Sequence, residues 1–206
     1  MKKIVRDFIN ISRKSKVWIK TSIIVFLLAL ALGVLTFFLR DLPTFVIASS
    51  TLTKIAELGK QAKAADFWGR FIIIYRNNLT SMLIVLFGGV FLGIPTLVGL
   101  FINGLILGFF TFILLFSNLP IFNKGIALLL LLPHGIIEIG AFLLAASWGL
   151  KLGLEHLLPT SKGKRTAVFI DNLKSSFLIF FLVAGGLAVA ALIEVLDMKL
   201  VEILVR

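Results

Sequence analysis

The residues best suited to chemistry lie in a hydrophobic part of the chain, at 133–138, where the sequence reads PHGIIE. His134 and Glu138 are four residues apart, so on a helix they share one face. A histidine beside a carboxylate can form a hydrogen-bonded pair, transfer a proton or supply half of a metal site. Pro133 removes a backbone donor and Gly135 permits an irregular turn, so we expect a broken helix here. The segment therefore predicts a polar site inside the membrane.

Three interpretations of this pair remain open. The first is a structural hydrogen-bonded network, with Asn103 or Asn78 as a further member. The second is passage of an ion or proton, because an ionisable residue inside a membrane is a functional candidate. The third is a divalent metal such as zinc, held by His134 and Glu138 from two protomers of a dimer. One chain supplies too few ligands for zinc, since it has no cysteine and a single further histidine, His156.

The elements that position this site must lie in a bilayer. The chain of 206 residues is 59% hydrophobic and 15% charged, and its mean hydropathy is +1.09. A soluble domain carries about 25% charged residues, so the composition excludes an ordinary soluble protein. The length suits one domain covering residues 1–206. The net charge of +11 would suggest nucleic acid on a soluble protein, but here we expect no such partner, because the bases follow the membrane topology.

The stretches without charged residues locate the membrane spans. Residues 21–39, 125–150 (apart from Glu138) and 175–193 can each form one helix, and 77–123 is long enough for two. The sequence thus predicts an all-α integral membrane protein, a bundle of about five transmembrane helices. Their expected ranges are 18–39, 78–98, 102–118, 125–151 and 176–196.

Details at the span ends follow from local sequence. Within the long stretch we expect a bend near Pro95 and a reversal in 96–104, because Asn103-Gly104 is typical of a turn. The first span lacks a small-residue cleavage site, so we expect it to be retained and not removed as a signal peptide.

The distribution of Lys and Arg predicts the orientation. Residues 1–20 and the basic loop 151–174 together carry 12 bases and 3 acids, whereas the segments on the other side carry 9 bases and 6 acids. The side with the larger excess of bases faces the cytoplasm. We therefore expect a multi-pass protein of the cell membrane with a cytoplasmic N-terminus and an external C-terminus. The excess also favours contact with anionic lipids of the bilayer.

The outer loop 40–76 is predicted to contain a short amphipathic helix. Its apolar stripe follows helical spacing and comprises Leu52, Ile55, Ala56, Gly59, Ala62 and Lys63. Phe67 and Trp68 with nearby arginines form an interfacial anchor. The helix either lies on its own membrane or docks an extracytoplasmic partner. Asn77-Asn78 is expected to cap the helix that follows.

Pairs of glycines four residues apart predict close helix packing, because lipid provides no hydrophobic drive for helices to associate. The pairs are Gly89 and Gly93, Gly104 and Gly108, and Gly149 and Gly153. Each pair serves either packing inside the bundle or a seam between the two chains of a homodimer.

Several of these motifs together resemble the stage II sporulation protein M family of multi-span membrane proteins. The resemblance covers most of the chain and is carried by Asn77-Asn78, Gly88-Gly89 with Gly93-Ile94, Asn103-Gly104 with Gly108, the 133–138 segment and Gly149-Leu150. It implies a membrane component that associates with peptidoglycan-degrading partners in the envelope. It implies no defined chemistry for His134 or Glu138.

The sequence therefore favours a non-enzymatic protein that oligomerises and scaffolds an envelope or cell-wall remodelling complex. A transporter or channel for an ion, proton or lipid is the alternative, built around His134 and Glu138. A further alternative is a metal-dependent membrane enzyme, although the sequence identifies no catalytic residue and only two ligands per chain.

Overall fold

The computed structural model describes residues 15–116 and 121–204, and within these ranges the chain forms helices and no strand. Five of the helices are long and apolar enough to cross a membrane, which confirms the predicted fold class. The elements, in chain order, are α2 (Lys16–Thr36), α3 (Pro43–Ala64), α4 (Phe67–Phe87), η1 (Gly88–Val90), α5 (Ile94–Phe116), α6 (Ile121–Leu154), η2 (Glu155–Leu157), η3 (Pro159–Ser161) and α7 (Arg165–Leu204).

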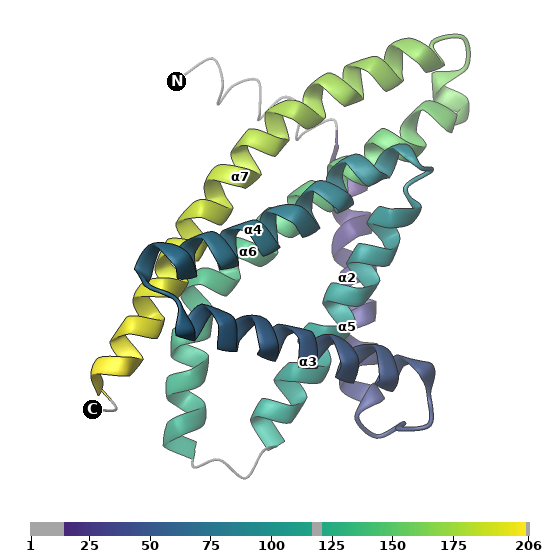
Figure 1. Cartoon of the computed structure of the whole chain (residues 1–206). Coiled ribbons are helices and arrows are strands. Elements are labelled where there is room, and N and C mark those ends of the chain that lie inside the picture. The colour runs from purple at the N-terminus through teal and green to yellow at the C-terminus, as the bar shows by residue number, and fades with distance from the viewer. Residues whose placement is uncertain (1–14, 117–120, 205–206) are drawn as a thin grey trace.

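The membrane-spanning helices form two groups that share a core (Figure 1). α2 and α5 lie side by side, and α4, α6 and α7 run diagonally next to one another. α3 crosses near one end and packs on α4 and α5. The main core contains fully buried Leu86, Leu100, Trp148 and Ile179. The start of α2 and the α6–α7 connection lie at the same end of the molecule, since Ser15 contacts Lys151.

The second and third spans reverse direction earlier than the sequence predicts. The turn comprises Phe91, Leu92 and Gly93, and the last two have φ values of 55° and 70°. Pro95 then falls in the first turn of α5, where its missing donor removes no helical hydrogen bond. Asn103-Gly104 lies inside α5. The expected ranges 78–98 and 102–118 are therefore replaced by α4 with η1 and by α5.

The second span also begins earlier than expected, so 40–76 is not one loop. Asp66 caps α4 by accepting a hydrogen bond from the Gly69 amide at 2.8 Å. Asn77 and Asn78 consequently lie inside α4 and do not cap it. The predicted outer helix is α3, although it is longer than expected.

The predicted apolar stripe of α3 is only partly buried. Ala62 is buried and Leu52 packs partly against the core, but Ile55 remains 49% exposed. Ala48, which the predicted stripe left out, is fully buried beside Phe109. The buried face of α3 therefore differs from the predicted one. The reason is that α3 packs against α4 and α5 and does not simply lie on the membrane surface.

The expected break in the fourth span is absent, because α6 continues from Ile121 to Leu154 with Pro133 inside it. A proline inside a helix removes one hydrogen bond and favours a bend, and the ribbon of α6 changes direction along its length in Figure 1. Gly135 has no atom within 4 Å of the position that a Cβ would occupy, so it brings no neighbour close. The segment therefore bends the helix without ending it.

The predicted glycine pairs are all used inside the protomer. Gly104 and Gly108 of α5 pack against the backbone of α2 near Phe26 and Leu30. On the α2 side of the same interface, Gly33 packs against the Leu105 backbone of α5.

A second seam joins η1 to α6. A Cβ on Gly89 would meet the Gly149 carbonyl, and a Cβ on Gly153 would meet the Gly89 carbonyl. Thr96 closes this seam, because its hydroxyl donates to the Val85 carbonyl at 2.7 Å. Both partners of each pair are thus occupied within one chain.

This packing predicts opposite effects of the same substitution at two glycines of α6. Gly149→Ala places a Cβ against the Val85 carbonyl and Thr96, so we expect a loss of about 1–3 kcal/mol of stability. Gly140→Ala meets no atom within 4 Å and gains helix propensity, so we expect equal or higher stability. Thermal unfolding in detergent micelles measures both. Equal destabilisation by the two variants would contradict the seam.

Candidate functional site

A cluster of polar side chains joins α4, α6 and α7. The Asn78 amide of α4 donates to Glu138 Oε1 of α6 at 2.5 Å. One turn earlier on α6, His134 Nδ1 lies 3.4 Å from Asp197 Oδ2 of α7. His134 is 8% exposed, so this contact is largely removed from solvent. The two α6 residues singled out in the sequence therefore share one side of the helix but contact different neighbours.

Glu194 of α7 brings a third carboxylate to the cluster. It interacts electrostatically with Glu138, His134 and Asp197. Glu194 and Asp197 are three residues apart, so they share a face of α7. The cluster thus combines three carboxylates with one histidine and one amide, and we call it the acidic cluster (Asn78, His134, Glu138, Glu194, Asp197).

The acidic cluster contains some predicted residues and omits another. Asn78 belongs to it, whereas Asn103 lies on α5 and donates to the Gly99 carbonyl of its own helix at 2.9 Å. Glu194 and Asp197 were counted only as charges outside the membrane. Their spacing of three residues at the end of an apolar run was the available signal, because it places two acids on one helix face.

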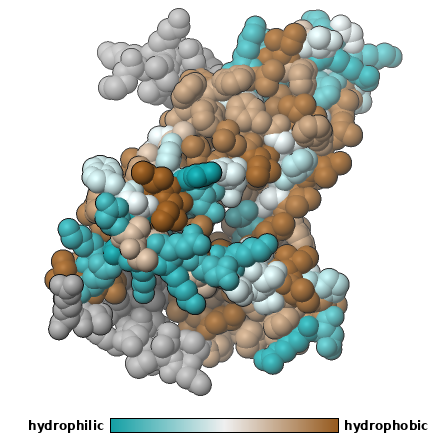
Figure 2. Space-filling view, in the orientation of Figure 1, coloured by the Kyte–Doolittle hydropathy of each residue, from teal (hydrophilic) through white to brown (hydrophobic). Residues whose placement is uncertain are grey.

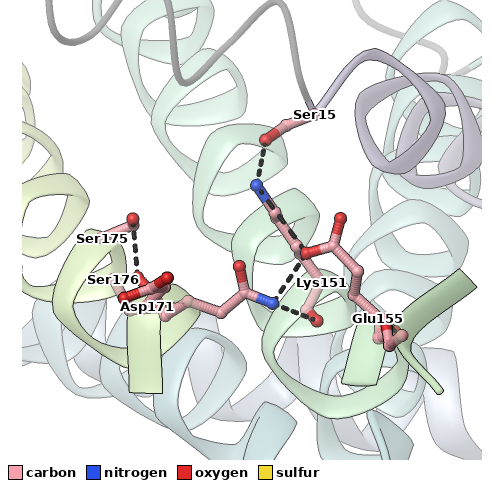
Figure 3. A network of polar contacts seen from close by, with 8 residues as sticks. Ser15, Lys151, Glu155, Asp171, Ser175 and Ser176 are labelled. Carbon is pink, nitrogen blue, oxygen red and sulfur yellow. Dashed lines mark hydrogen bonds and ion pairs between the residues drawn. The ribbon is translucent and has the colours of Figure 1, made fainter. Parts of the chain in front are cut away.

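A second polar network lies at the other end of α6 (Figure 3). Lys151 is 6% exposed, and its Nζ donates to Ser15 Oγ at 2.9 Å and lies 3.9 Å from Glu155 Oε2. The Asn172 amide of α7 donates to the same Glu155 oxygen at 2.7 Å. From the sequence alone, Lys151 is only one of the bases of the 151–174 loop. We call these four residues the lysine network (Ser15, Lys151, Glu155, Asn172).

The lysine network connects the start of α2, the end of α6 and the start of α7. Asn172 also donates to the Lys151 backbone carbonyl at 3.4 Å, so it contacts the main chain of α6 as well as the Glu155 side chain of η2. Lys151 further lies over the Trp148 ring, 6.0 Å from its centre. A buried lysine with these partners fixes how three helices meet.

The two sites lie far apart along the bundle. His134 and Lys151 are separated along α6 by about 26 Å at 1.5 Å per residue. The hydrocarbon core is about 30 Å thick. Because the lysine network marks one end of the bundle, the acidic cluster lies well away from that end.

A packed apolar layer separates the two sites. The intervening stretches 139–150 of α6 and 177–193 of α7 contain no titratable side chain. Ala145 and Ala146 of α6 pack there with Ile179, Val183 and Leu187 of α7, all at most 1% exposed. Proton transfer between the two sites would need titratable groups or water in this layer.

The spacing of the possible ligands bears on the metal hypothesis. Over residues 15–116 and 121–204, no group of three or more His, Cys, Asp or Glu side chains is spaced to hold a metal ion. In the acidic cluster, Glu138 contacts Asn78 and His134 contacts Asp197, in both cases across a helix interface.

Comparison with known proteins identifies a family whose model covers most of the described helices. The family model described as Stage II sporulation protein M matches residues 22–196. A protein of Methanocaldococcus jannaschii, described as uncharacterized, is 27% identical over 151 residues, which cover 72% of this chain and 82% of that protein. No solved structure matches the chain. The match includes both seams and all of the acidic cluster except Asp197.

The acidic cluster predicts energetic coupling between Asn78 and Glu138. Asn78→Ala removes the donor to a partly buried carboxylate, so we expect a loss of about 1.5–3 kcal/mol. In a Glu138→Leu background the same change should cost much less, because the acceptor is already gone. Unfolding of the four proteins in detergent measures the difference. Additive losses would show that the hydrogen bond does not stabilise the fold.

Proposed function

The chain belongs to the stage II sporulation protein M family, and we propose that this membrane protein is a non-enzymatic scaffold of an envelope or cell-wall remodelling complex. The observation that carries the proposal is the apolar layer between the two polar sites. A scaffold needs helices fixed at both ends, and the lysine network and acidic cluster hold α6 and α7 in this way. A path for ions or protons needs a continuous series of polar groups, and the apolar layer interrupts such a series between the two sites.

The surface proposed to receive the partner is the polar face of α3. Lys54, Glu57 and Lys60 are exposed there, and Figure 2 shows a hydrophilic band that follows α3 between hydrophobic regions. Both ends of the helix are attached to the bundle. At its start, Thr36 and Thr44 lie 3.1 Å apart at their hydroxyls. Such attachment lowers the entropic cost of binding a partner.

Arg70 provides the attachment at the other end of α3. Its guanidinium donates to the carbonyls of Lys63 and Ala65 at 3.1 Å and 3.0 Å, and pairs with Glu202 of α7 at 2.8 Å. One side chain thereby connects the end of α3 to α4 and to the last turns of α7. The polar face of α3 is thus held at a fixed position on the bundle.

This proposal predicts position-dependent crosslinking in native membranes. A photo-crosslinking residue at Lys60 on α3 should capture a specific extracytoplasmic protein. The matched control is Leu28 on α2, which is 67% exposed in a lipid-facing span and should capture no such protein. Mass spectrometry of the products identifies the partner. If neither Lys60 nor Lys54 yields a product absent from the Leu28 control, the scaffold proposal fails.

We also propose that the protein forms a homodimer, and the glycine pairs restrict how it can do so. The three predicted pairs are occupied within the protomer, so a dimer must use other small residues. Gly185 of α7 is exposed and has no atom within 4 Å of an added Cβ. Small residues on a lipid-facing surface allow a second helix to approach closely.

Ion or proton transport is the second candidate, favoured by the three carboxylates of the acidic cluster. Acidic residues within membrane-spanning helices commonly mark ion pathways. If transport is the function, purified protein in liposomes should carry a proton or cation flux that Glu138→Gln reduces at least tenfold. Gln keeps an acceptor for Asn78, so the variant should remain folded. Wild-type flux equal to that of protein-free liposomes would eliminate this candidate.

A further inference from the structure

The turn between α4 and α5 is an exposed apolar tip. Its residues Phe91, Leu92 and Ile94 are 70%, 54% and 58% exposed, and Val90 before them is also exposed. The chain carries no charge between Arg76 and Lys124. A connection that lay in water would normally contain polar residues, since loops are exposed to solvent. We call residues 90–94 the apolar tip.

The apolar tip has a fixed conformation. Leu92 adopts a φ of 55°, in the left-handed region that leucine rarely occupies, and Gly93 follows at 70°. Hydrogen bonds from the Gly93 amide to the Gly89 carbonyl at 2.8 Å and from the Ile94 amide to the Phe91 carbonyl at 3.1 Å close the turn. The strained turn therefore directs large apolar side chains away from the protein.

Basic residues lie farther out at the same end of the molecule. The Cβ position of Gly93 lies near Leu150 and Leu154 of α6, so the apolar tip is level with the lysine network. The α6–α7 connection extends beyond that level in Figure 1. Lys162 and Lys164 in this connection and Arg165 at the start of α7 are all exposed. Apolar side chains at one depth and bases farther out match a lipid leaflet, which has acyl chains inside and phosphates outside.

We propose that the apolar tip inserts into the leaflet at this end of the bundle, while the bases at 162–165 bind the phosphates of anionic phospholipids. The α4–α5 connection then remains within the membrane interface and does not emerge into water. The chemistry of this surface matches a phospholipid. The bases at 162–165, which we call the basic rim, suit an anionic headgroup, and the uncharged apolar tip suits the acyl chains attached to it. The scaffold role and this lipid contact use opposite ends of the bundle.

Because the chain has no cysteine, single cysteines can report the depth of each segment. Phe91→Cys and, as the aqueous control, Thr160→Cys on η3 are labelled with an environment-sensitive fluorophore. The proteins are reconstituted in vesicles of phosphatidylcholine and phosphatidylglycerol. Quenching is measured with brominated lipids and with iodide in water. Leu28→Cys gives the reference for a lipid-facing position.

The label at 91 should be quenched by brominated lipid and protected from iodide at least threefold relative to the label at 160. Iodide quenching at 91 as strong as at 160 would overturn the proposal. Protection at 91 from both quenchers would also overturn it, since another protein chain would then cover the tip. Size-exclusion elution unchanged from the unsubstituted protein shows that each variant is folded.

The basic rim is tested separately by the lipids retained after purification. Native mass spectrometry should show that the double variant Lys164→Gln/Arg165→Gln retains less than half of the phosphatidylglycerol retained by the unsubstituted protein. Phosphatidylcholine retention should not change. Added inorganic phosphate should not displace the lipid, because the apolar tip contributes to binding. Equal phosphatidylglycerol retention, or its displacement by phosphate, would contradict the proposed lipid site.

Discussion

Close approach of helix backbones at the two glycine seams is the constraint on which the rest of the structure depends. In a bilayer, apolar side chains gain little by leaving lipid for protein, so helices associate through close packing. Gly104 and Gly108 join α5 to α2, while Gly89 and Gly149 join η1 to α6. With these contacts in place, the α4–α5 pair packs closely against α6. This close packing lets Asn78 lie opposite Glu138.

Buried polar groups add specificity to this packing. A seam of glycine and alanine allows one helix to slide along the other, because successive small residues present similar surfaces to the facing helix. A hydrogen bond from Asn78 to Glu138, and one from Asn172 to Glu155, can form in only one register. Leaving either carboxylate without a partner would be costly in a low-dielectric surrounding. The polar contacts therefore specify the arrangement that the glycines permit.

The sequence predicts those features that depend on local composition. Charge-free runs located the spans because one charge in hydrocarbon outweighs several weak propensities. The reversal at residues 91–93 was missed because Asn103-Gly104 resembles a turn, yet Gly104 serves packing on α2. The bond between Asn78 and Glu138 joins residues 60 positions apart. The lysine network likewise joins Ser15 to Lys151, so its burial depends on tertiary packing that local patterns do not encode.

The position of the acidic cluster decides how its charges can be used. Its carboxylates lie toward the end of the bundle where α3 and the last turns of α7 are attached. The apolar layer of α6 and α7 isolates them from the lysine network. Within the cluster, the contacts of Asn78 with Glu138 and of His134 with Asp197 cross from α4 to α6 and from α6 to α7. The charges of the acidic cluster are therefore placed to hold these three helices together, apart from the lysine network.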